Sequence, residues 1–168
     1  MSDASSIRLA SSLSSQSSPG ATFYKSAIRF NNNQPHYNSG SQWVGIGNVV
    51  LSVPVVLAAN EVDQNVFIAD RAYQVVSVSE SHAVAEATAS SLTLTVKKAA
   101  SGTAIASGTN VLSTTFNLKS TANTPITLGV SATAADSVVA AGNRLGFDFS
   151  GSPTELAGTV VTIVLRPV

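Results

Sequence analysis

Apolar and polar residues alternate most regularly in the middle of the chain. Leu92, Leu94 and Val96 are separated by polar residues, and the alternation resumes over residues 112–118. A period of two is the pattern of a half-buried antiparallel strand. Two turn-prone Ser-Gly-Thr clusters lie between these two runs. Residues 91–118 therefore predict two strands joined by an exposed loop.

The same pattern predicts strands on both sides of this pair. The expected strands cover residues 49–57, 66–69, 73–79, 126–130, 145–149 and 159–165. Pro54 indicates either an edge position for the first of them or a break that divides it into two strands, because proline cannot donate a backbone hydrogen bond. The last strand has apolar residues on both faces, which places it centrally or against a neighbouring subunit.

These strands predict the fold class and the core. Turns recur at intervals of roughly 8 to 15 residues and no long amphipathic helix is visible, so the chain is expected to be all-β. About eight strands favour an antiparallel β-sandwich of the jelly-roll type over an immunoglobulin-like arrangement. The predicted core residues, each on the apolar face of an alternating strand, are Leu94, Phe116, Phe147 and Ile163.

A second set of residues is expected to point outward. Val160, Thr162 and Val164 lie opposite the core-facing residues of the last strand, and Tyr73 and Val75 are expected to form a second outward patch. A monomer with both patches would expose more apolar surface than is usual. These five residues are therefore the predicted interface of a homo-oligomer, for which closed cyclic symmetry is the usual arrangement.

The first quarter of the chain differs in composition from the rest. Residues 1–43 are rich in Ser, Asn, Gln and Gly and offer too little apolar surface to order alone. We therefore predict an extended, low-complexity arm over residues 1–43, and a β-sandwich domain over residues 44–168 that folds without it. Either the arm has no role or its basic and aromatic residues bind a partner. The candidate contacts are Arg8, Phe23, Tyr24, Lys25, Arg29, Phe30, Tyr37 and Trp43.

Composition narrows the classes of partner. Nine basic and nine acidic residues balance, which argues against binding to nucleic acid or to an anionic membrane surface. Charged residues make up only 11% of the chain, well below the usual quarter. No apolar run approaches the ~20 residues that cross a bilayer, and the first residues lack the pattern of a signal peptide. The weakly charged, hydroxyl-rich surface favours a protein that packs against other proteins.

Few residues are candidates for catalysis or metal binding. The chain has no cysteine and two histidines, and the G-x-S-x-G motif of serine hydrolases is absent. Glu80 and His82 are expected on one face of a strand, with Glu86 further on. They are either metal ligands or, as we favour, the solvated polar end of that strand. We expect no catalytic residues, no metal site, no cofactor and no enzymatic activity.

Three segments near the C-terminus carry a family resemblance. Residues 131–136 read SATAAD, residues 139–145 read VAAGNRL and residues 156–162 read LAGTVVT. The chain resembles the capsid decoration, or cement, proteins of tailed bacteriophages, in which AAGDRLGxDFxG followed by LAGxVVTVxL closes a small jelly-roll-type domain. Asn143 stands where that pattern has Asp. The resemblance spans residues 73–168 and transfers no functional residues.

The resemblance implies a viral structural protein. Such a protein lies on the outer surface of the capsid in the virion and stabilises the shell by bridging subunits of the major capsid protein. A trimer is favoured over a dimer, because three copies of the arm reach several capsomers around one point. The alternative is a carbohydrate- or receptor-binding domain of a virion fibre, with Trp43 and Tyr73 as candidate binding aromatics. A hydrolase built around His82 is disfavoured.

Overall fold

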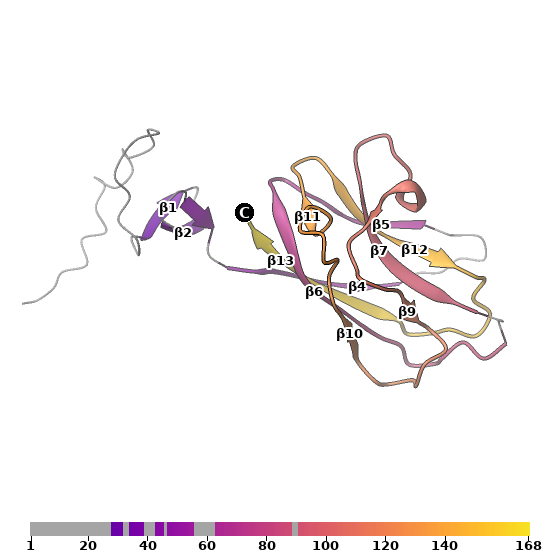
Figure 1. Cartoon of the computed structure of the whole chain (residues 1–168). Coiled ribbons are helices and arrows are strands. Elements are labelled where there is room, and N and C mark those ends of the chain that lie inside the picture. Colours follow the sequence, from indigo (N-terminus) through magenta and orange to yellow (C-terminus); the bar gives the residue numbers. More distant parts are fainter. Residues whose placement is uncertain (1–27, 32–33, 39–42, 46, 56–62, 89–90) are drawn as a thin grey trace, which may run out of the picture. The chain divides into compact units, whose positions relative to one another are not determined.

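The computed structural model describes residues 28–31, 34–38, 43–45, 47–55, 63–88 and 91–168 (Figure 1). The chain divides into two compact units, Met1–Gly47 and Asn48–Val168. The boundary that we predicted between residues 43 and 44 and the independent folding of the larger part stay predictions. No helix among the described residues has the length and apolar character to traverse a membrane.

The N-terminal unit contains a small antiparallel sheet. It has the order β1-β2-β3, with β1 at Ile28–Asn31, β2 at Gln34–Asn38 and β3 at Trp43–Gly45. The sequence predicts no strand in this segment. Each strand has only 3–5 residues, and polar residues interrupt the apolar ones, so no period of two is visible.

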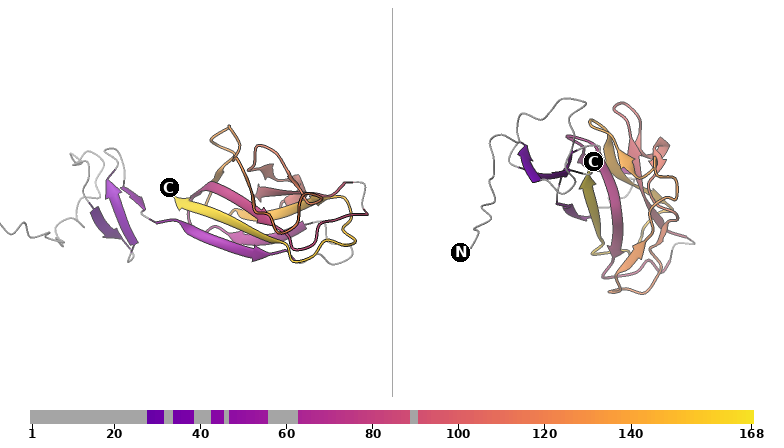
Figure 2. Two further views of the ribbon diagram at one scale, coloured as in Figure 1. Left: turned by 90° about the horizontal axis from the view of Figure 1, so that it is seen from below. Right: turned by 60° about the vertical axis from the view of Figure 1, so that its left-hand side comes forward.

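The larger unit consists of two antiparallel sheets. Its strands are β4 (Val49–Pro54), β5 (Asp63–Ile68), β6 (Tyr73–Ser81), β7 (Thr93–Ala99), β8 (Thr109–Asn110), β9 (Phe116–Asn117), β10 (Ile126–Leu128), β11 (Val138–Val139), β12 (Arg144–Ser150) and β13 (Val160–Pro167). The β6–β13 sheet has the order β10-β6-β13-β4, and β11 also pairs with β6. The β7–β12 sheet has the order β5-β12-β7-β8, and β9 also pairs with β7. Figure 2 shows the ribbon of the chain, with both sheets of this unit, in two further views.

The order of the strands is that of a jelly roll. The first strand of the domain, β4, pairs with the last, β13, and the second, β5, pairs with the second-last, β12. Such nested pairing places β4 and β13 in one sheet and β5 and β12 in the other, as in the double Greek key of this fold. The predicted all-β sandwich is therefore confirmed. The central place of β13 and the edge position of Pro54, the last residue of β4, are confirmed as well.

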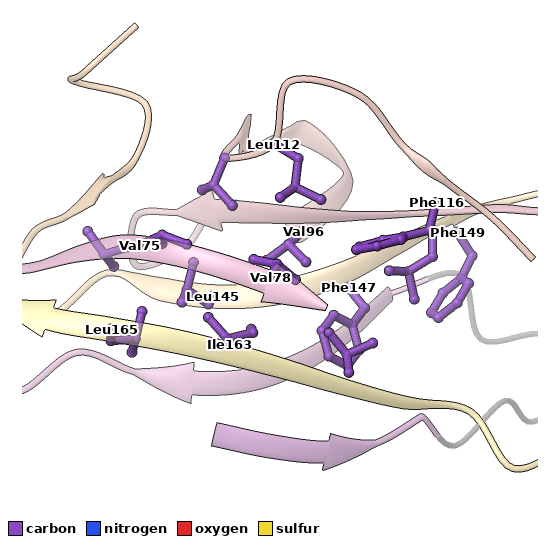
Figure 3. Close-up of a cluster of buried hydrophobic side chains, with 14 of the residues drawn as sticks. Val75, Val78, Val96, Leu112, Phe116, Leu145, Phe147, Phe149, Ile163 and Leu165 are labelled. Atoms are coloured by element: carbon purple, nitrogen blue, oxygen red, sulfur yellow. The ribbon is translucent and has the colours of Figure 1, made fainter. Parts of the chain in front are cut away.

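The core lies between the two sheets. Leu94, Phe116, Phe147 and Ile163, the four residues predicted from alternation, are each 0–1% exposed. Figure 3 shows side chains of β6 and β13 meeting those of β7 and β12 in this layer. The alternating pattern therefore identified the buried face of four strands correctly.

A bulge in β6 makes one face assignment wrong. Val164 pairs with Ser77 but Leu165 pairs with Val75, so Val76 is an extra residue in the ladder. An extra residue reverses the facing of every residue before it. Tyr73 and Val75, predicted to point outward, are therefore buried in the core at 5% and 1% exposure, and the predicted interface loses both of them.

The loop after β7 covers the outer face of the β7–β12 sheet. It contains the short 3-10 helix η2 (Ile105–Ser107), and Ile105 is 2% exposed. Gly146 of β12 makes room for it, since a Cβ atom there would lie 2.6 Å from Ile105 Cγ1. The sequence predicted an exposed loop. Ile105 of this loop is instead buried against the sheet, and the loop covers part of that face.

Candidate functional site

The outer face of the β6–β13 sheet carries exposed and half-buried side chains along its described strands. Every second residue of these strands points into the core, so the residues between them point outward. Apart from Gln74 and Arg166, which pair at one end of the sheet, the outward residues are Val50, Ser52 and Pro54 on β4, Val160, Thr162 and Val164 on β13, Val76, Ser77, Ser79 and Ser81 on β6, and Thr127 on β10. We call this surface the neutral face, because none of its residues is ionisable.

A row of four hydroxyl groups crosses the neutral face. Strand pairing sets Ser52 beside Thr162, Thr162 beside Ser79, and Ser79 beside Thr127. Ser52 Oγ lies 3.1 Å from Thr162 Oγ1, and Ser79 Oγ lies 2.7 Å from Thr127 Oγ1. Each pair is thus joined by a hydrogen bond within the face. We call these four residues the hydroxyl row.

Exposed valines flank the hydroxyl row. Val50 is 60% exposed, Val76 is 43% exposed and Val160 is 41% exposed. They are three of the six large apolar residues that are exposed in the described part of the chain. Arg166 lies beyond the row at one end of the sheet, where its guanidinium donates a hydrogen bond to Gln74 Oε1. Half of these exposed apolar residues therefore lie on a surface that carries charge only at its margin.

The outer face of the β7–β12 sheet has the opposite character. Lys97 and Asp148 form an ion pair of 2.7 Å there. Lys97 Nζ also donates to the carbonyl of Ala106, and Arg144 donates to the carbonyls of Ala100 and Thr103. These bonds fasten the covering loop to the sheet. Among the described residues, the neutral face is thus the sheet surface that no such loop is fastened to by side-chain hydrogen bonds.

Part of the predicted interface lies on the neutral face. Val160, Thr162 and Val164 point outward from the centre of the sheet, as the sequence predicted. Sequence reasoning missed Val50, Ser79, Thr127 and the other residues beside them, because only the pairing of β4, β6 and β10 with each other and β13 brings them together.

The predicted contacts of the arm fall into two groups. Arg8, Phe23, Tyr24 and Lys25 lie outside the described residues. The others lie in the N-terminal sheet: Arg29 and Phe30 on β1, Tyr37 on β2 and Trp43 on β3. Their role in binding stays a prediction.

Glu80 and His82 are buried together at the end of β6. Both side chains are fully buried, and His82 Nδ1 lies 2.8 Å from Glu80 Oε1. His82 Nε2 lies 3.1 Å from the carbonyl of Ser120 and donates to it. The two residues share a face, as predicted, but the favoured description of them as a solvated strand end is wrong. Their polar atoms connect β6 to the turn before β10 and offer no surface to a substrate.

Glu86 is the most heavily bonded carboxylate among the described residues. Its oxygens accept hydrogen bonds of 2.7–3.1 Å from the backbone and hydroxyl of Thr88, the backbone and hydroxyl of Thr154, and the backbone of Glu155. This carboxylate fastens the segment after β6 to the loop before β13. The described residues contain no group of three His, Cys, Asp or Glu side chains able to hold a metal ion.

Tyr73 is held by the turn between β5 and β6. Its hydroxyl donates a 2.6 Å hydrogen bond to Asp70 Oδ1, and its ring meets that of Phe67 edge-on at 5.5 Å. Burial raises the pKa of the Tyr73 hydroxyl. The bond from Tyr73, followed by that from Arg71, lowers the pKa of Asp70. At 5% exposure, Tyr73 does not serve as an exposed aromatic for a sugar.

Replacing Tyr73 with phenylalanine is expected to raise the pKa of Asp70 toward its ordinary value, because the strongest cause of its depression is removed. Arg71 keeps the pKa somewhat depressed. A carboxyl group with a lowered pKa contributes stability above its unfolded pKa of about 3.9, and that contribution disappears as the pH falls. The variant should therefore lose less stability than the wild type on acidification. An NMR titration of the Asp70 carboxyl carbon measures the change in pKa. An unchanged pKa would contradict the hydrogen bond from Tyr73 as the main cause of the lowered pKa.

Comparisons with known proteins add no family to this description. No protein-family model matches the chain, and a search of curated proteins finds no match.

Proposed function

We propose that the chain is a structural protein of a tailed-phage virion that decorates the outer surface of the capsid and stabilises it. The observation that carries the proposal is the neutral face, which combines exposed valines with internally bonded hydroxyls on a rigid sheet. Such a surface suits contact with protein, since covering it removes apolar area from water without stripping a charge of its hydration.

The segments SATAAD, VAAGNRL and LAGTVVT support the choice of a decoration protein within the class of structural proteins. In this proposal the N-terminal segment binds the major capsid protein through its basic and aromatic residues. The jelly-roll domain packs against neighbouring protein through the neutral face. Many equivalent copies on one shell make modest individual contacts effective.

Co-sedimentation tests the proposal directly. The purified chain is mixed with heads assembled from the major capsid protein of the same genome and is centrifuged. We expect saturable binding with a fixed number of chains per head, and a higher melting temperature of the decorated heads. Heads that already carry the protein are the control and should bind no more. A chain that stays in the supernatant at micromolar concentration would refute the decoration role.

A further inference from the structure

We infer that the neutral face is a self-association surface, on which a second copy of the chain packs face to face about a two-fold axis. This inference rests on the proposal that the neutral face contacts protein, and it names the partner as a second copy of the same face. Three properties of the face support this choice: its lack of charge, the bonding of its hydroxyls and the arrangement of its valines.

The lack of charge restricts the partner. A charged surface placed on the neutral face would lose its hydration and find no opposite charge in return, which is costly. The partner surface must therefore be neutral as well. The β7–β12 sheet of another copy does not qualify, because it carries Lys97, Asp148 and Arg144 under its covering loop. The neutral face of a second copy meets the requirement.

The hydroxyl row is suited to a partner identical to itself. In each bonded pair, Ser52 with Thr162 and Ser79 with Thr127, one hydroxyl donates to the other. One hydroxyl proton per pair remains, together with free lone pairs on the oxygens. Two opposed rows can therefore exchange hydrogen bonds, so that burial leaves few polar atoms unsatisfied.

The valines lie on both sides of the hydroxyl row. Val50 and Val164 are paired neighbours on one side, and Val160 lies on the other side, next to Pro54. A two-fold axis through the middle of the row sets apolar residues of one copy against apolar residues of the other. An isologous interface of this kind closes at two copies.

Light scattering of the full chain, without heads, tests the inference. We expect a mass of two 17.1 kDa chains at micromolar concentration. A mass of one chain would overturn the inference. The partner of the neutral face would then be residues 1–47 or the major capsid protein, and not a second copy. A mass of three chains would also overturn it and would support the trimer predicted from the sequence.

A pair of matched variants locates the interface. Val160→Lys places a charge on the neutral face and is expected to give a monomer, with the dimer dissociation constant raised at least 100-fold. Ile68→Lys makes the same change at a residue of β5 that is 69% exposed, and should stay dimeric. Circular dichroism checks that both variants are folded. If Val160→Lys remains a dimer with the wild-type dissociation constant, the interface lies elsewhere and the inference fails.

The conservative variant Thr162→Cys gives a readout that does not depend on a new charge. The chain has no cysteine of its own, so a short bis-maleimide can join two copies only through the introduced thiols. Crosslinked dimers are expected for Thr162→Cys and not for Ile68→Cys. Equal crosslinking of the two variants, or none for Thr162→Cys, would contradict face-to-face packing. Co-sedimentation of a monomeric Val160→Lys variant with heads would show that decoration stands even where self-association is lost.

Discussion

Replacing Phe147 with alanine is expected to lower the free energy of unfolding by about 3 to 5 kcal/mol. Phe147 lies on the central strand β12, paired with Gln64 of β5 and Val96 of β7, and is completely buried. Figure 3 shows its ring inside the layer between the sheets. Truncation removes the ring and leaves a cavity that paired strands on both sides cannot easily close. Urea unfolding at constant pH measures the change.

Two control variants separate packing from other effects of the substitution. Phe147→Leu keeps most of the volume and should cost less than about half as much. Ile68→Ala removes an exposed apolar side chain and should change stability by about 0.5 kcal/mol or less. A loss below about 1 kcal/mol for Phe147→Ala would contradict its place in the core.

Alternation in the sequence was sufficient to predict the strands and most of the core. It works because one face of each strand is buried, and this requires an apolar residue at every second position. Leu94, Phe147 and Ile163 follow that rule without interruption. β6 does not, because the bulge at Val76 shifts the alternation by one residue. A valine fits both faces of a strand, so the sequence carries no mark of the shift, and Tyr73 and Val75 were placed outward.

The neutral face was predictable only in part. The apolar outward residues of β13 identified Val160, Thr162 and Val164 from one strand alone. The hydroxyl row requires knowing that β4, β13, β6 and β10 are neighbours in that order. These strands are far apart in the sequence, and serine or threonine on an isolated strand looks like ordinary solvent-exposed residues. The hydroxyl row therefore follows from the order of the strands in the sheet, and not from the residue pattern within any one strand.

The buried carboxylates were the least predictable residues. Glutamate is almost never buried unless it is paired, so sequence reasoning placed Glu80 and Glu86 in solvent or on a metal. The structure gives Glu80 a partner in His82, which itself bonds the carbonyl of Ser120, and it gives Glu86 partners from a distant segment in Thr154 and Glu155. These contacts depend on how loops return to the sandwich, which no local pattern encodes.

Replacing Glu86 with alanine is expected to lower the free energy of unfolding by about 3 kcal/mol, as much as a core truncation. Glu86 is 2% exposed, and its two oxygens accept five hydrogen bonds from Thr88, Thr154 and Glu155. Without the carboxylate, three backbone N–H groups lose their acceptor, and the hydroxyls of Thr88 and Thr154, which also bond each other, each lose a partner. The loop before β13 is then no longer fastened to the segment after β6. Urea unfolding measures the loss, and faster amide hydrogen exchange at Thr154 and Glu155 locates it.

Glu155→Ala is the matched control for this prediction. It removes the same type of side chain and the same charge from an exposed position, while the backbone N–H of residue 155 still donates to Glu86. Its effect should be within about 0.5 kcal/mol. Glu86→Gln is the more specific test. Its amide nitrogen carries two N–H groups, which would face the N–H groups and hydroxyls that now donate to the carboxylate. It should destabilise the chain although its size is unchanged. A glutamine variant as stable as the wild type would show that the five hydrogen bonds do not hold the loop, and that the burial of Glu86 is incidental to the stability of the jelly roll.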